Sequence, residues 1–158
     1  METTYLFPNK YQKIGWAILI PSAIMGILTV ANDWNPAILD VEVFAILIEG
    51  FSNHFRVMGM VANNILDEIC GILLIIGCIL VAFSKETDED ELISSIRLKS
   101  LVWATYWNYG ILLLAFLLVY DISFFWVMIF NLYTILIFFI FKFKWSVRQL
   151  RKGVLDEE

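Results

Sequence analysis

Four long apolar blocks dominate this chain and restrict what it can fold into. A helix needs about 20 largely apolar residues, with a range of about 17–25, to cross the ~30 Å hydrocarbon core of a bilayer. Apolar residues make up 60% of the chain, compared with about 45–50% in soluble domains, and they gather in blocks near this length. The blocks are Ile14–Ala31, Ile69–Phe83, Leu101–Tyr120 and Phe124–Phe141.

The blocks predict an all-α fold, an integral membrane four-helix bundle in a single transmembrane domain over residues 1–158. The spans are expected at about 10–31, 65–84, 100–120 and 123–142, and the second reaches this length only with Asp67 and Glu68 in its first turn. A soluble helical core is one alternative, but the run "LYTILIFFIFKFKW" has no polar face to offer water. A removed signal peptide is another, although the first block exceeds the usual core of about 7–15 residues.

The basic residues indicate how the helices are oriented. Lys and Arg near the ends of spans mark the cytoplasmic side of a membrane. With four spans, all of the 11 Lys and Arg residues except Arg56 fall on one side, which predicts both termini in the cytoplasm. The opposite, outer side is acidic and is expected to attract cations or a basic partner, unless its charge only keeps the loop soluble. Its acids are Asp33, Asp40, Glu42, Glu49, Asp67, Glu68 and Asp121.

The densest charge lies between the second and third blocks, in "FSKETDEDELISSIRLKS". Thr87 or Asp88 is predicted to cap a helix there, and Asp88 with Glu91 has the spacing of a capping box. One long helix is expected from about residue 88 to Tyr120, with residues 88–99 extending into the cytoplasm. Arg97 is then expected to snorkel at the headgroups. A divalent-metal site at the four consecutive acids is the alternative, but adjacent acids on a helix point to different faces.

Residues 32–64 form a long outer loop that is expected to cap the bundle. A loop of this length without secondary structure is unusual. Alternation of polar and apolar residues from Asp40 to Val43 favours a short strand. The apolar run that follows fits either a strand or a surface helix. Residues 143–158 form the cytoplasmic tail.

Two groups of polar residues are the candidate sites. The first is expected at the outer face and could bind a cation, although acids also complement a helix N-terminus without any ligand. It consists of Asn63, Asn64, Asp67, Glu68 and Asp121. The second lies within the spans, where its members could line a pore or make hydrogen bonds between helices. It consists of Asn108, Asn131 and Thr134.

Residues typical of catalytic or cofactor-binding sites are scarce. The single histidine, His54, lies in the outer loop, so two axial histidines for a buried haem are not available. No glycine-rich phosphate loop follows a strand, and no charged residue lies at the centre of a span, which argues against an intramembrane proton relay. No enzymatic activity, cofactor or metal is expected.

The stretch "NNILDEICGILLIIGCILVAFSKETDEDELISSIRLKSLVWA" and the following hairpin resemble a group of small, uncharacterised four-span bacterial integral membrane proteins. The resemblance covers spans two to four and implies the fold but no activity. The expected function is that of a non-enzymatic protein of the cytoplasmic (inner) membrane that works through self-association or partner binding, as an adaptor, sensor or accessory subunit. The alternative is an oligomeric cation-selective pore or small-solute transporter. Expected partners are the lipid bilayer, further copies of the chain and a cytoplasmic protein, with no nucleic acid.

Overall fold

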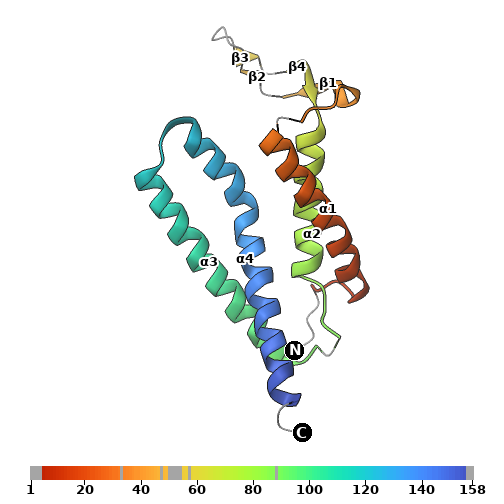
Figure 1. The fold of residues 1–158 in the computed structure, drawn as a ribbon, viewed down its shortest axis with the longest axis vertical. Helices are drawn as coiled ribbons and strands as arrows, with labels where there is room; N and C mark the ends of the chain where they lie inside the picture. The colour runs from red at the N-terminus through yellow and green to blue at the C-terminus, as the bar shows by residue number, and fades with distance from the viewer. Residues whose placement is uncertain are drawn as a thin grey trace. The chain divides into compact units, whose positions relative to one another are not determined.

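The computed structural model describes residues 5–32, 34–46, 48–49, 55–56, 58–87 and 89–155, without the side chains of 48–49, 55–56 and 154–155. This part of the chain is mostly helical, which confirms the coarse fold prediction. Its four α-helices are α1 (Lys10–Asn32), α2 (Leu66–Ala82), α3 (Glu91–Leu118) and α4 (Asp121–Leu155) (Figure 1).

Three of these helices, α1, α3 and α4, are long and apolar enough to cross a membrane. Helix α2 has 17 residues and therefore a length of about 26 Å, the short end of the spanning range. Length and composition make the chain compatible with a membrane protein. The crossing of a membrane by all four helices and the direction of each crossing stay predictions.

The chain divides into two compact units, and each is described by itself. The first comprises Met1–Leu19 with Leu74–Glu158, and the second comprises Ile20–Leu73.

Helices α3 and α4 form an antiparallel hairpin in the first unit (Figure 1). Small and polar residues of α3 are buried, as their helical spacing predicts; they are Ser100, Ala104, Asn108 and Ala115. To the core cluster that contains Ala104, α4 contributes large aromatic side chains, including Phe139 and Phe143. Helix α4 continues to Leu155 and so includes most of residues 143–158, which were predicted as a tail. It is helical there because Val147 belongs to the same core.

The start of α3 differs from the prediction. The helix begins at Glu91, and its N-cap is Asp90, whose side chain accepts a hydrogen bond from the Ile93 N–H. The predicted cap at Thr87 is therefore wrong, and Asp88 lies outside the described residues. The cap lies at Asp90 because Glu89 forms an ion pair with Arg97 and does not enter the helix.

Helices α1 and α2 approach closely within the first unit. A Cβ atom added to Gly15 would lie 2.9 Å from the Leu80 Cβ, and one added to Gly77 would lie 2.9 Å from the Leu19 Cα. Real Cβ atoms do not come this close to other atoms, so both positions require glycine. Small residues of this kind let helix backbones approach.

The second unit shows that the outer loop contains strands. Strand β1 (Asp40–Ala45) pairs antiparallel with β4 (Gly59–Asn64), in a register that places Asp40 opposite Asn64 and Ala45 opposite Gly59. The short strands β2 (Ile48–Glu49) and β3 (Phe55–Arg56) also pair. A single 3-10 turn, η1 (Ala37–Leu39), precedes β1. The strand predicted from Asp40 is therefore present. The apolar run after it continues β1 to Ala45, bends at Ile46 and is strand again at Ile48–Glu49.

Candidate functional site

The outer polar group surrounds the start of α2 in the second unit. The Asn64 Oδ1 accepts a hydrogen bond from the Leu66 N–H at 3.2 Å, and the Asn64 Nδ2 donates to the Asp40 Oδ1 at 2.6 Å and to the Pro36 carbonyl at 2.9 Å. The Asn63 Nδ2 donates to the Glu68 Oε1 at 2.7 Å. Asn64 therefore ties the base of the hairpin to the start of the helix.

The five predicted outer residues do not all belong to one compact unit. Asp67 lies exposed in the first turn of α2, and no contact between it and the two asparagines is described. Asp121 belongs to the other compact unit, where it begins α4 with a φ angle of 57°. Within the described residues, no three His, Cys, Asp or Glu side chains are grouped so that they could hold a metal ion. His54 lies outside those residues.

The second predicted polar group, which consists of Asn108, Asn131 and Thr134, is also divided. The Asn131 Nδ2 of α4 donates to the Asn108 Oδ1 of α3 at 3.2 Å, and Asn108 is only 2% exposed. This hydrogen bond links the two helices of the hairpin. Thr134 does not join it, because its hydroxyl donates to the Phe130 carbonyl of its own helix at 2.8 Å. The pair of Asn108 and Asn131 therefore lies between α3 and α4.

A third polar group, which sequence reasoning missed, lies in the first unit where α2 ends and α3 begins. We call it the buried ion cluster. Its members are Gln12, Glu86, Glu89, Arg97, Lys144 and Arg151. They come from α1, from the α2–α3 connection, from α3 and from α4, so that four separate parts of the chain meet there.

Glu86 lies at the centre of this cluster, with a side chain only 5% exposed. Its carboxylate accepts hydrogen bonds from the Lys144 Nζ at 2.5 Å, the Gln12 Nε2 at 3.0 Å and the Arg151 Nη2 at 3.4 Å. Burial raises the pKa of Glu86, but the hydrogen bond and charge of Lys144, followed by Gln12 and Arg151, outweigh it and lower the pKa below its ordinary value. Glu86 is therefore held as a carboxylate.

Arg97 forms the second half of the cluster and contradicts the predicted snorkelling. Its Nη2 donates to both carboxylate oxygens of Glu89, at 2.8 and 3.0 Å, and its Nη1 donates to the carbonyls of Ala82 and Ser84. Ala82 is the last residue of α2 and Ser84 lies two positions beyond it, where backbone acceptors lack helical partners. The guanidinium also lies 4.4 Å from the centre of the Phe143 ring. Arg97 is thus a buried cap of α2, since its planar fork fits several acceptors at once.

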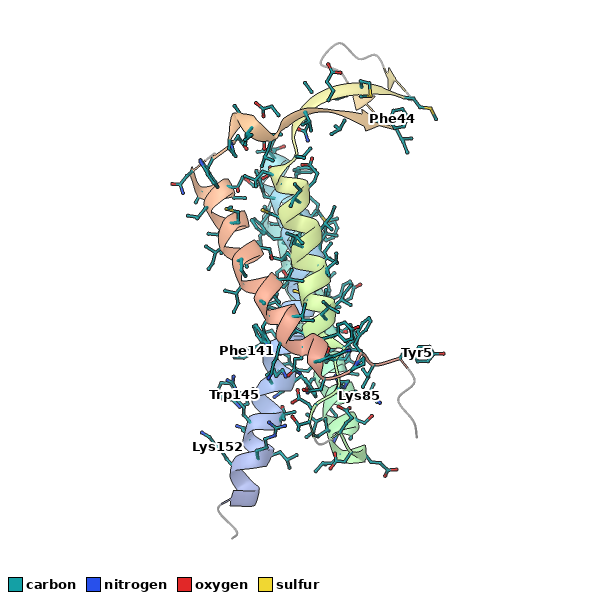
Figure 2. The ribbon with its side chains drawn as sticks, turned by 90° about the vertical axis from the view of Figure 1, so that its right-hand side faces the viewer. Tyr5, Phe44, Lys85, Phe141, Trp145 and Lys152 are labelled. Atoms are coloured by element: carbon teal, nitrogen blue, oxygen red, sulfur yellow. The ribbon has the colours of Figure 1, made fainter. Side chains whose placement is uncertain are left out.

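The N-terminal segment is fastened to the same place. Phe7 pairs with Ser84 in a parallel β-bridge, in which the Phe7 N–H donates to the Phe83 carbonyl and the Lys85 N–H donates to the Phe7 carbonyl. The Asn9 Nδ2 donates to the Lys85 carbonyl at 2.8 Å. Figure 2 shows Tyr5, in the segment before α1, and Lys85, just after the end of α2. It also shows Phe141, Trp145 and Lys152 following one another along α4.

Comparison with known protein families, with curated proteins and with solved structures finds no match for this chain. The resemblance to small four-span bacterial membrane proteins therefore stays a prediction.

Proposed function

We propose that this chain is a non-enzymatic integral membrane protein that crosses the cytoplasmic membrane four times, with both termini in the cytoplasm, and acts through self-association or partner binding. The observation that supports this most directly is how little apolar surface the chain covers by itself. Only 17% of the apolar window of α1, 17% of that of α3 and 11% of that of α4 are buried. Lipid or other protein must cover the remainder, because such helices have no polar face for water.

The proposed cytoplasmic side has an ordered surface for a partner. The buried ion cluster fixes the N-terminal segment and the α2–α3 connection against α4. Along the same part of α4 that supplies Lys144 and Arg151 to the cluster, Trp145, Arg148 and Lys152 are exposed. An aromatic side chain beside basic ones favours an acidic protein partner, since aromatic and Arg residues contribute most at interfaces.

Two measurements test this proposal. Counting photobleaching steps of singly labelled chains in lipid vesicles should find more than one copy per complex; complexes that contain only single copies would contradict self-association. Co-purification of a soluble protein should be lost in the double variant Arg148→Glu and Lys152→Glu. These positions are better than a truncation of residues 146–158, because that truncation would also remove Val147 from the core and Arg151 from the ion cluster.

An oligomeric cation-selective pore or small-solute transporter is the second candidate. The acids of the outer side and the asparagine pair within the spans favour it. The burial of Asn108 within its own hairpin favours a structural role instead, because a buried amide is not available to a passing ion. Cation flux into vesicles that disappears in Asn131→Leu would support the pore. Absence of flux from vesicles containing the unaltered chain would leave the non-enzymatic adaptor as the better proposal.

A further inference from the structure

We infer that the end of the α3–α4 hairpin where α3 begins binds the headgroup of an anionic phospholipid through Lys99 and Lys142, beside Trp103. This inference rests on the proposed membrane insertion and adds a lipid to the partners proposed above. It depends on two lysines that come from different helices to one tryptophan, on the lack of an acid paired with either, and on their depth in the proposed membrane.

Trp103 joins the two helices at this end of the hairpin. The centre of its ring lies 5.8 Å from that of Trp107, on the next turn of α3, and 6.4 Å from that of Phe138 on α4. Trp103 is partly buried against the core of the first unit. Tryptophan is enriched at the membrane–water interface, because its large apolar ring carries a polar N–H. The three rings therefore form an aromatic surface suited to the headgroup level.

Two positive charges lie beside this aromatic surface. The Lys142 Nζ of α4 lies 5.5 Å from the centre of the Trp103 ring, a cation–π contact that holds the side chain against α3. Lys142 is partly buried there. Lys99 precedes Trp103 by four positions and so lies on the same face of α3, where it is exposed. The two helices thus bring two ammonium groups to one tryptophan.

Neither lysine is paired with an acid in the part of the chain that the structure describes. The ion pairs found there all belong to the buried ion cluster, whose acids are Glu86 and Glu89. Lys144 contacts Glu86, and Lys142 lies about 200° from Lys144 around the helix, on the side turned away from that acid. Because partial burial removes water from the Lys142 ammonium, an anion from outside the chain is favoured.

The depth of the two lysines selects a phospholipid as the source of this anion. Residues 99 and 142 stand at the cytoplasmic ends of the spans proposed at 100–120 and 123–142, which is the level of the phosphate groups of the inner leaflet. Basic sites between transmembrane helices on the cytoplasmic side bind anionic headgroups. A headgroup bound there places its acyl chains along the apolar part of the hairpin, a contact that free phosphate cannot make.

The test counts the lipids bound to the full-length chain by native mass spectrometry, in detergent with added phosphatidylglycerol or phosphatidylcholine. One phosphatidylglycerol should bind at concentrations at which phosphatidylcholine does not. Lys142→Gln and Lys99→Gln should each weaken this binding about fivefold, which corresponds to the contribution of one basic residue near a membrane surface. Lys142→Arg should retain it, because arginine keeps both the charge and the contact with the ring.

Lys13→Gln is the matched control. Lys13 is an exposed lysine of α1 near the same proposed side of the membrane, and its described contacts include no aromatic ring. Its loss should leave lipid binding unchanged. An equal loss in all three glutamine variants would overturn the inference, because it would reflect only the total charge of the protein.

Two further outcomes would also overturn the inference. Equal binding of phosphatidylglycerol and phosphatidylcholine would show that the site does not recognise an anion. Displacement of the lipid by inorganic phosphate at equal concentration would assign the two lysines to free phosphate instead. Either result would leave the proposed crossing of the membrane intact, because labelling of cysteines in intact cells tests that crossing independently of lipid binding.

Discussion

Among the single residues, Glu86 is the acid on which most contacts of the buried ion cluster depend. It is nearly inaccessible to solvent and faces Lys144, Arg151 and Gln12 through its carboxylate, while its N–H donates to Glu89. Its three side-chain partners come from α1 and α4, which are far from it in the sequence. A change at this position therefore affects two helices, α1 and α4, together with the α2–α3 connection.

Replacement of Glu86 by Gln should lower the free energy of unfolding by about 3 kcal/mol, because it leaves the largely buried Lys144 without its counter-charge. The measurement is equilibrium unfolding in mixed detergent micelles, followed by circular dichroism. Glu91→Gln is the control, since Glu91 is an exposed acid in the first turn of α3. An equal and small effect of both substitutions would show that the ion cluster contributes little to stability.

Stability should also depend on pH through Glu86. The folded state lowers its pKa below the ordinary value of 4.5, so the unfolded chain binds more protons at moderately acidic pH. The contribution of Glu86 is therefore complete above about pH 4.5 and is lost as the pH falls through the folded pKa. Comparing the unaltered chain with Glu86→Gln between pH 7 and 3 should show the difference in unfolding free energy shrinking. A constant difference across this range would contradict the assignment.

At the scale of elements, the pairing of α1 with α2 depends on glycine. Gly77→Ala should destabilise the fold by about 1–3 kcal/mol, because its Cβ would meet the backbone of Leu19, which cannot move aside. Gly153→Ala in α4 should instead stabilise it by up to about 1 kcal/mol, since that glycine has open space around it. Unfolding in mixed micelles measures both. Stabilisation by Gly77→Ala would mean that the two helices do not pack this closely.

The elements also show what the sequence can predict. The presence of α1, α3 and α4 follows from apolar length alone, and the strand at Asp40 follows from alternation. The start of α3 was not predictable in detail, because four consecutive acids offer several caps and only the pairing of Glu89 with Arg97 decides among them.

The buried ion cluster was not predictable for a related reason. Arg97 near a membrane end fits a snorkelling residue equally well, and Glu86 contacts Lys144 and Arg151 at 58 and 65 positions along the chain. The spacing of residues within a short stretch of sequence cannot predict contacts between residues so far apart in the chain. Asn108 and Asn131 could be named from the sequence because two amides within apolar helices have few other partners, and the structure joins them by a hydrogen bond.

For the whole molecule, the central claim is that four helices cross the membrane with both ends on one side. Helix α2 is the critical crossing, because it is the shortest and because the side on which α3 begins depends on it. If α2 did not cross, the basic residues at Lys85, Arg97 and Lys99 would lie opposite those of the N-terminal segment, against the tendency of Lys and Arg to stay in the cytoplasm. A test of whether α2 crosses the membrane therefore tests the proposed topology of the entire protein.

Labelling of single cysteines in intact cells with a membrane-impermeant maleimide tests this claim most directly. The background carries Cys70→Ala and Cys78→Ala, which removes both native thiols. Met60→Cys in β4 should react from outside, whereas Lys85→Cys after α2 and Lys152→Cys near the end of α4 should react only after permeabilisation. Labelling of Lys85→Cys or Lys152→Cys from outside intact cells would contradict the proposed topology.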